Sequence, residues 1–463
     1  MLLTHPQPPA NFLQTQKSRK LAVSDVSNES PNPSQPSPQQ MDLVTVWLCH
    51  LGNRHQESFE PWGDLFADGG FYSHYNNYII FKQSFYHLIA QKDLYIHYPQ
   101  EQYDLFKYPP TFALLFAPFS VLPDVVGYPL WTAINLLLPV VAIQKLKGLS
   151  QRGKSAFSVI LLLEGITSAL NSQSNGLMLG LLLLAFVALQ QQSYTKAILF
   201  IWLTAFIKLF GLLFFALILF FPTAMKKSLW RIPVVFGLLF ILPWPILGWE
   251  GLVTQYQSMF DLLAHDHGFF VKYSVMGWLK QWFAFQPDKN MMLVFGLIMQ
   301  LLPLLVFFVR YNLWQSNSLA KLNPLILSKF RFLYAGSWLI WMVIFNHMAE
   351  SATYVIAVGG ALLILTSLYF KESPSDTTEN KLELRQMMKS ENSKIWILGF
   401  VLLLLFTVLG PTDIYPKPLR FWIVEQAQLK AFPCIFIWVL SLVEFLKTFR
   451  LERSQASERL NNQ

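Results

Sequence analysis

From about residue 110 onward the chain consists of apolar runs separated by polar gaps. A straight helix needs about 20 apolar residues to cross a bilayer, and shorter or broken segments are tolerated inside protein. The runs cover 124–145, 156–171, 176–191, 196–208, 209–222, 231–249, 291–309, 331–346, 351–370, 394–411 and 430–447. They predict an all-α integral membrane protein, a polytopic helical bundle of about 11 spans or half-spans. Two of the half-spans would meet as a hairpin near Lys208.

The composition supports lipid as the main solvent of this chain. Charged residues make up 13% of the 463 residues, about half of the roughly 25% usual in soluble domains. The net charge of +8 is interpreted as cytoplasmic loop charge, because no basic stripe with interleaved aromatics lies outside those loops. Cys49 and Cys434 are far apart and form no CxxC, which argues against a disulfide framework or a zinc site.

The sequence divides into four parts. Residues 1–70 are predicted to be a disordered or weakly ordered N-terminal segment, since the first 40 are rich in Pro, Gln, Ser and Asn and show no cleavable signal peptide. Residues 71–123 are predicted to form an external loop with an amphipathic helix. Residues 124–449 are predicted to form the transmembrane domain, and 450–463 a cytoplasmic tail.

The charges in the gaps predict the topology. Five basic gaps fall on one side when the runs alternate across the membrane, and the positive-inside rule makes that side cytoplasmic. The opposite gaps are 71–123, 171–176, 250–290, 346–351 and 411–430. They carry most of the residues capable of acid–base chemistry. This placement favours chemistry on an external substrate over transport, which would require polar groups near the midplane.

The first external segment contains the densest motif. Residues 79–89 carry apolar side chains at three- and four-residue spacing, which predicts an amphipathic helix in the interface. Lys92-Asp93-Leu94-Tyr95 and an aromatic linker follow. Lys107-Tyr108-Pro109-Pro110 then precedes an apolar helix, and the two prolines fix a sharp change of chain direction where that helix begins. Taken alone, the segment has an alternative interpretation as a solvated turn between two interfacial helices.

The order of these elements resembles the opening of glycosyltransferase family 87. Members of this family are polytopic enzymes, similar in architecture to the glycosyltransferase C superfamily, that take mannose or a related sugar from a polyprenyl phosphate. Asn171-Ser172-Gln173-Ser174-Asn175-Gly176 is similar to the family's Gly-Gln-x-Asn element, and Lys208 to its lysine before a short aromatic helix. Tyr273–Gly277 and the turn from Asn346 to Tyr354 stand where the family has an Asn-Gln-Ser stretch and a His-containing external turn. The resemblance covers residues 75–370.

The resemblance implies a substrate site at the external face. Positive charge and hydrogen-bond donors around the donor phosphate would assist its departure. Candidate substrate-binding residues are Tyr108, Lys107, Lys208, Asn171, Gln173, Asn175 and Lys272. For Lys208, snorkelling to the nearest interface is the alternative role.

The expected catalytic base departs from the family pattern. Family members usually carry an Asp just before the amphipathic helix, and Asn77, or alternatively Asn76, stands at that place here. Asn cannot accept a proton at neutral pH, so Asp104, Asp93 and Glu350 are candidate substitutes.

Three other polar positions stand out. The turn with His347 and Glu350 separates two apolar spans, which makes both candidates for catalysis or phosphate contact, with helix capping as the alternative. His265-Asp266-His267 has no third metal ligand nearby, so no metal site is assigned. Its alternatives are an ordinary polar loop and a lid over the acceptor. Glu164 lies inside an apolar run, which predicts pairing with a polar neighbour.

The resulting interpretation is a multi-pass plasma-membrane hexosyltransferase, a mannosyltransferase in the first instance. It would move the sugar from a polyprenyl-phosphate donor to a lipid-linked or surface glycan acceptor. The chemistry resembles that of an inverting glycosidase with an acceptor hydroxyl in place of water. The phosphate is a good leaving group, so a second carboxylic acid is unnecessary. No metal is demanded, and no cofactor is expected. The alternatives are a catalytically inactive prenyl-lipid-binding relative, favoured by Asn77, and a transporter or flippase.

Overall fold

The computed structural model describes residues 63–65, 71–73, 75–265, 272–311, 323–370 and 393–461. The chain forms two units, Met1–Leu48 and Cys49–Gln463, and every described residue belongs to the second. Apart from residues 63–65, the predicted N-terminal segment 1–70 therefore lies outside the described residues. So do Asp266 and His267 of the polar loop.

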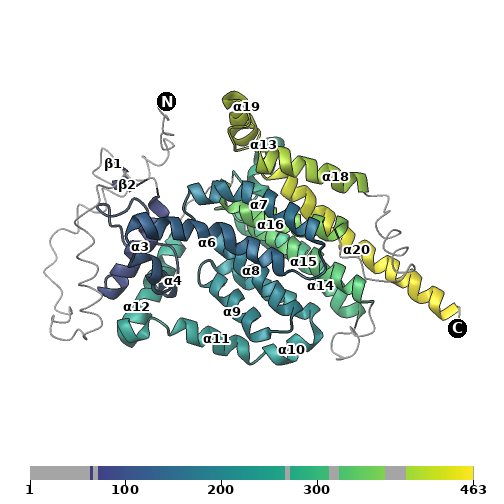
Figure 1. The fold of residues 1–463 in the computed structure, drawn as a ribbon, viewed down its shortest axis with the longest axis horizontal. Coiled ribbons are helices and arrows are strands. Elements are labelled where there is room, and N and C mark those ends of the chain that lie inside the picture. The colour runs from purple at the N-terminus through teal and green to yellow at the C-terminus, as the bar shows by residue number, and fades with distance from the viewer. Residues whose placement is uncertain are drawn as a thin grey trace. The chain divides into compact units, whose positions relative to one another are not determined.

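All but two of the regular elements in the described residues are helices, which confirms the predicted helical class (Figure 1). The exception is one antiparallel hairpin of two three-residue strands, β1 Gly63–Leu65 and β2 Phe71–Ser73, in which Asp64 pairs with Tyr72. The helix α3, Asn76–Ile89, corresponds to the predicted amphipathic helix. Two short helices follow it, α4 Pro110–Leu115 and α5 Ala117–Ser120.

The first external segment packs through aromatic rings. Phe81 on α3 makes edge contacts with Phe112 and Phe116, at centroid distances of 5.2 and 5.4 Å. Tyr78 and Leu88 of the same helix are fully buried. The apolar face of α3 therefore rests on α4 and α5, and Pro110 starts α4 at its first position, where a missing N–H does no harm.

Five helices in the described residues are long and apolar enough to cross a membrane. They are α6 Asp124–Lys145, α7 Gln151–Leu170, α14 Lys289–Arg310, the helical run Ser351–Tyr369 formed by η4 Ser351–Thr353 and α16 Tyr354–Tyr369, and the part Phe432–Phe449 of α20 Phe432–Asn461. The run predicted at 231–249 is not one straight helix. It divides into α11 Arg231–Phe240 and α12 Trp244–His265, which meet at 95° and pass the span criterion only together.

The bend between α11 and α12 has a local cause. Pro243 and Pro245 each lack the backbone N–H that a continuous helix would use. A second kink lies inside α12, where Gly248 adopts a φ of 66°, a left-handed conformation that favours glycine. The predicted count of about 11 spans or half-spans is not confirmed: within the described residues five helices, or six spans with this bent pair, are long and apolar enough to cross, and four shorter apolar helices lie at other predicted runs.

Most of the remaining helices are shorter. They are α8 Asn175–Gln190, α9 Tyr194–Ala205, the 3₁₀ helix η2 Leu209–Phe220, α10 Pro222–Ser228, α13 Val275–Phe283, α15 Pro324–Ile344, α18 Ser393–Leu402, the π-helix η5 Leu403–Val408, α19 Lys417–Phe421 and the π-helix η6 Trp422–Gln426. Of these, α15 matches the spans in length and the others are mostly half-span or shorter. The helices α9 and η2 pack against each other on either side of Lys208, as the predicted hairpin requires.

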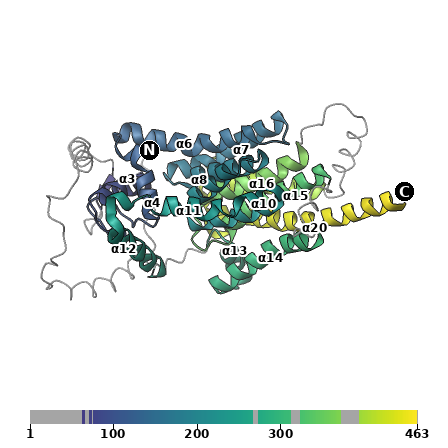
Figure 2. The ribbon, with the colours of Figure 1, turned by 90° about the horizontal axis from the view of Figure 1, so that it is seen from below.

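The helices α15 and α16 form the centre of the bundle. Figures 1 and 2 show them with α7 and α8 on one side and α20 and α14 on the other. In an 18-residue window of the run Ser351–Tyr369, 89% of residues are buried, against 33% in an 18-residue window of α14, so the first is an inner helix and the second faces outward. A Cβ on Gly336 would lie 2.6 Å from the carbonyl oxygen of Gly360. Small residues at this crossing allow the two backbones to approach closely.

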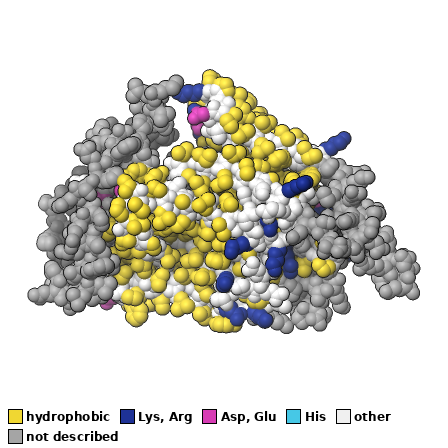
Figure 3. Space-filling view, in the orientation of Figure 1, with side chains coloured by type: hydrophobic (Ala, Val, Ile, Leu, Met, Phe, Trp, Pro, Cys, Tyr) yellow, Lys and Arg dark blue, Asp and Glu magenta, His cyan; other side chains and the backbone are white. Residues whose placement is uncertain are grey.

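The outer helices expose apolar side chains, as lipid contact requires. Met291, Ile298 and Leu305 on α14 and Val125 and Leu137 on α6 are all exposed. Hydrophobic side chains cover much of the face drawn in Figure 3, while Lys and Arg gather below and to the right of its centre. This separation of lipid-facing and basic surface is typical of a multi-pass membrane protein.

The gaps predicted to be cytoplasmic lie together. The amide of Ser150 donates to the carbonyl of Phe370 at 2.8 Å, and the Arg331 guanidinium donates to the carbonyl of Phe220 at 3.0 Å. Lys329 pairs with Glu444 on α20 at 2.6 Å. The gaps that were assigned to one side of the membrane from their charges are therefore also packed together.

Candidate functional site

The gaps predicted to be external also meet one another. The Asn77 side-chain amide donates to the carbonyl of Asn171 at 2.8 Å, which joins the first gap to the second. Gln173 bonds Glu350, which adds the gap between α15 and α16. Segments from distant parts of the sequence thus build one polar region at the end of the bundle opposite the basic gaps.

Two more contacts extend this region. The Tyr354 hydroxyl donates to the carbonyl of Tyr273 at 2.9 Å. Lys272 forms an ion pair with Glu425 in the segment before α20. Each of the five predicted external gaps therefore contacts at least one other.

A continuous chain of hydrogen bonds runs through the region. The Gln173 amide donates to the Glu350 carboxylate at 2.5 Å, and the Asn175 amide donates to the Gln173 side-chain oxygen at 2.7 Å. The Lys208 ammonium donates to the Asn175 side-chain oxygen at 3.1 Å. We call these four residues the amide relay. It places a cation at one end, a carboxylate at the other and two amides between them.

The turn between α7 and α8 carries the middle of the relay because its backbone is held on both sides. Ser172 adopts a φ of 54°, and its carbonyl accepts a bond of 2.9 Å from the indole N–H of Trp131 on α6. The Asn135 side chain accepts a bond of 2.8 Å from the amide of Leu177. Gly176 sits so close to α6 that a Cβ there would lie 2.2 Å from the carbonyl oxygen of Asn135. The amide side chains thus have a rigid support.

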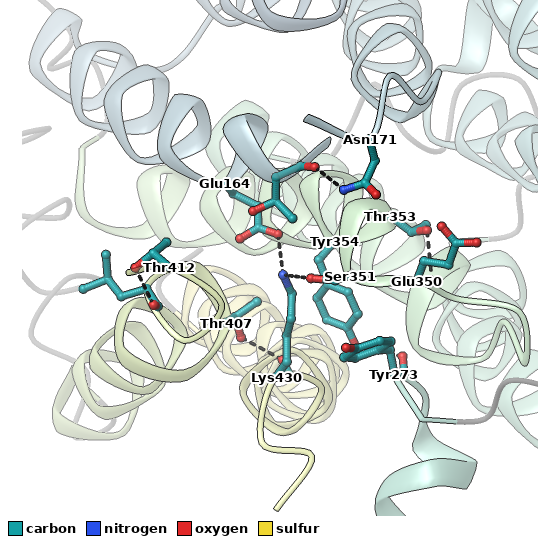
Figure 4. Close-up of polar contacts among 12 residues, drawn as sticks. Glu164, Asn171, Tyr273, Glu350, Ser351, Thr353, Tyr354, Thr407, Thr412 and Lys430 are labelled. Atoms are coloured by element: carbon teal, nitrogen blue, oxygen red, sulfur yellow. Dashed lines mark hydrogen bonds and ion pairs between the residues drawn. The ribbon is translucent and has the colours of Figure 1, made fainter. Parts of the chain in front are cut away.

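Glu350 stands at the accessible end of the relay. Its side chain is exposed, whereas Asn175 is fully buried and Gln173 is 8% exposed. Glu350 and Thr353 also form a capping box at the start of η4, in which each side chain bonds the other's backbone amide (Figure 4). The predicted capping role is therefore present together with the bond to Gln173. Two donors hold the carboxylate while part of it remains open to a ligand.

Two phenols lie close to Glu350. Burial raises the pKa of Tyr108, the Ser174 hydroxyl opposes this shift, and the charge of Glu350 adds to it. Burial, followed by the charge of Glu350, raises the pKa of Tyr273 to about 12. Both phenols therefore remain protonated at neutral pH and can donate hydrogen bonds. The ring of Tyr108 is held by Phe81 and Phe112 at centroid distances of 4.9 and 5.1 Å.

A buried ion pair lies beneath the Glu350 turn. The Lys430 ammonium contacts the Glu164 carboxylate and the Ser351 hydroxyl, both at 2.9 Å, and both charged side chains are 0% exposed (Figure 4). The predicted pairing of Glu164 is confirmed. Lys430 was not singled out from the sequence, because it stands at the edge of an apolar run and resembles an ordinary flanking lysine.

The other candidate bases lie in different surroundings. Asp104 is exposed, and its carboxylate accepts from the amide of Leu105 at 2.7 Å, with Lys107 at 4.0 Å. Asp93 uses one oxygen for the amide of Tyr95 at 2.9 Å and the other for the hydroxyl of Ser258 at 3.3 Å. Asp93 therefore fastens the loop to α12. Neither carboxylate belongs to the amide relay.

The turn residue His347 lies three positions before Glu350 and is half-buried. His265 lies at the end of α12, where its ring nitrogen is 2.8 Å from the carbonyl of Asp261. Within the described residues, no group of three or more His, Cys, Asp or Glu side chains could hold a metal ion.

One model of a known protein family matches part of this chain. The model of Glycosyltransferase family 87 matches residues 106–333. The matched region contains Tyr108, Gln173, Asn175 and Lys208 and ends before Glu350. A comparison with curated proteins gave no match.

Proposed function

We propose a specific activity for this protein on the premise that residues 106–333 belong to glycosyltransferase family 87, a family of membrane glycosyltransferases. The protein transfers a hexose, with mannose as the first sugar to test, from a polyprenyl phosphate to a lipid-linked or surface glycan. The reaction takes place at the outer face of the plasma membrane. The amide relay from Lys208 to Glu350 is the observation that carries this proposal, because it joins a cation suited to phosphate with a carboxylate suited to a hydroxyl.

Glu350 acts as the general base in this proposal. Its carboxylate is exposed and oriented by Gln173 and Thr353, so an acceptor hydroxyl can approach it and give up a proton during attack. Asp93 has both oxygens engaged in fastening the loop, and Asp104 is exposed outside the relay. Glu350 is therefore favoured among the three carboxylates predicted as substitutes for the family Asp.

Lys208 and Tyr108 act on the leaving phosphate. The Lys208 ammonium uses one N–H for Asn175 and retains two further donors for phosphate oxygens. The Tyr108 hydroxyl remains protonated because burial raises its pKa, so it supplies a neutral donor near Glu350. As the bond between the sugar and the phosphate oxygen breaks, both groups stabilise the charge that develops on that oxygen.

The bond changes give inversion at the anomeric carbon. The acceptor oxygen forms its bond on the face opposite the departing phosphate, while its proton passes to Glu350. The polyprenyl phosphate leaves with the bonding electrons. A second carboxylic acid is unnecessary, since the phosphate leaves as an anion.

Asn77 has a supporting role in this scheme. It stands where family members usually carry the base, and its amide donates to the carbonyl of Asn171 next to the relay. An amide cannot take the acceptor proton, so Asn77 braces the turn that presents Gln173. The presence of Asn instead of Asp at this position is also the observation that favours the alternative, an inactive relative that binds prenyl lipid.

The decisive experiment uses the full chain, purified in detergent and reconstituted into vesicles. Radiolabelled mannosyl and glucosyl polyprenyl phosphates are supplied with a lipid and glycan extract of the source cells. Transfer of label with inversion at the anomeric carbon supports the proposal. Saturable donor binding without transfer would instead identify an inactive relative, and accumulation of intact donor across the bilayer would identify a flippase. A nucleotide sugar is the control donor and should give no product.

A further inference from the structure

The ion pair of Lys430 and Glu164 is not used by the proposed reaction. Both side chains are fully buried, and the Tyr354 ring lies 5.3 Å from the ammonium. Lys430 also contacts Ser351, the residue that directly follows Glu350. Within the described residues, the second oxygen of Glu164 has no hydrogen-bond partner. A buried charged pair is weak evidence for stability, because apolar residues of similar volume often stabilise a fold equally well.

The position of the pair relative to the relay is informative. Glu164 lies on α7, and the turn that ends α7 carries Gln173. Ser351 lies beside Glu350. The Lys430 ammonium, which contacts Glu164 and Ser351 (Figure 4), therefore bridges the same two segments that the bond between Gln173 and Glu350 joins.

We propose that Lys430 and Glu164 are positioning residues, which fix the turn bearing Glu350 against the end of α7. This inference rests on the proposed function in so far as Glu350 is the base. The pair touches no substrate. Because Lys430 contacts both α7 and η4, it sets the distance between the Glu350 carboxylate and Gln173. Thr407 on η5 holds Lys430 in turn, by donating a hydrogen bond of 2.9 Å to its carbonyl.

The chain offers a matched control in a second ion pair. Lys329 and Glu444 lie 2.6 Å apart with side chains 13% and 10% exposed, and they join α15 to α20 at the basic end of the bundle. Neither residue belongs to the relay or contacts Ser351. Removing this pair tests the effect of losing a largely buried ion pair without touching the Glu350 turn.

The first measurement is kinetic. The double variant Glu164→Gln/Lys430→Met removes both charges, so no lone buried charge is left to prevent folding. We expect kcat to fall about a hundredfold with little change in the donor KM, because a small displacement of the base lowers the rate and not the binding. Ser351→Ala should also lower kcat, but by a smaller factor. Ser351→Thr keeps the hydroxyl and should retain the wild-type kcat. Lys329→Met/Glu444→Gln should retain kcat.

The second measurement needs no activity. A Met348→Cys reporter on the same turn, in a Cys49→Ser background, is labelled with a membrane-impermeant maleimide in the vesicles. We expect the labelling rate to change severalfold in Glu164→Gln/Lys430→Met and to stay constant in the Lys329→Met/Glu444→Gln control.

The two measurements separate the two ideas. If the wild-type protein transfers no sugar, the proposed function fails, while the maleimide rates still decide whether the pair positions the turn. Equal rates in the reporter proteins with and without the Lys430 pair overturn the positioning role. So does an unchanged kcat in a folded Glu164→Gln/Lys430→Met protein, or an equal loss of kcat in the control pair.

Discussion

The side-chain amide of Gln173 donates a hydrogen bond of 2.5 Å to the carboxylate of Glu350, across 177 positions of sequence. The bond joins the turn after α7 to the turn after α15. It continues through Asn175 to Lys208, so four polar side chains from three separate turns form one line. A base and a phosphate contact held in a single network keep their separation fixed while substrates enter and leave.

Glu350→Gln should abolish most of the transfer activity while leaving the protein folded. The amide keeps the size and the bond to Gln173 but cannot accept a proton, and loss of a general base lowers kcat by about 10²- to 10⁴-fold. Initial rates with saturating donor measure the effect, and Asp104→Asn is the matched control for loss of an exposed carboxylate. A fully active Glu350→Gln protein combined with an inactive Asp104→Asn protein would transfer the assignment to Asp104.

Lys208→Met should weaken donor binding and also slow the chemical step, because the ammonium contacts the phosphate before and during its departure. A charge-assisted hydrogen bond contributes about 1.5–3 kcal/mol, so the donor KM should rise about ten- to hundredfold. The readout is the dependence of initial rate on donor concentration. Lys107→Met removes a lysine that lies 4.0 Å from Asp104 and does not belong to the amide relay, and it should leave KM unchanged. An unaltered KM together with an unaltered kcat in Lys208→Met would assign Lys208 to structure alone.

The sequence predicted single helices better than the contacts between them. The run 124–145 coincides with α6 because Pro123 precedes it and an extended residue, Leu146, ends it. By contrast, 231–249 was predicted as one run although Pro243 and Pro245 break it, because mean hydropathy does not register a missing backbone donor. Apolarity locates a segment in lipid, but it carries little information on its direction.

The candidate site shows the same limit. Gln173 and Glu350 were both predicted as site residues from their gaps, since ionisable and amide side chains beside apolar spans are unusual. Their contact was not predictable, because it depends on how α7, α15 and α16 pack. Lys430 was missed for a related reason. Its partner Glu164 lies 266 positions away, and no local pattern distinguishes it from a flanking lysine.

Gly176→Ala should destabilise the protein and displace the relay. The new Cβ would lie 2.2 Å from the carbonyl oxygen of Asn135, and neither backbone can move without shifting α6 or α8. Overpacking of this kind costs about 1–3 kcal/mol. Thermal unfolding in detergent measures the loss. Gly237→Ala on α11 is the control, because nothing lies within 4 Å of its Cβ position. Equal thermal unfolding midpoints for the two variants would show that α6 and α8 can move apart without a measurable loss of stability.

Stability should fall in acid through the pair of His87 and Glu101, which join α3 to the following loop at 2.7 Å. The hydrogen bond from His87 lowers the pKa of Glu101 below its usual 4.5, against the opposing effect of burial. A carboxyl group with a lowered folded-state pKa stabilises the fold above its unfolded pKa, and this contribution disappears as the pH falls through the folded value. The unfolding midpoint should therefore drop below about pH 4.5. Glu101→Gln should flatten that part of the curve, whereas Asp104→Asn, which leaves the pair intact, should keep the drop. If the unfolding midpoint of Glu101→Gln depends on pH in the same way as that of the wild type, the pair of His87 and Glu101 is excluded as the cause of the acid destabilisation.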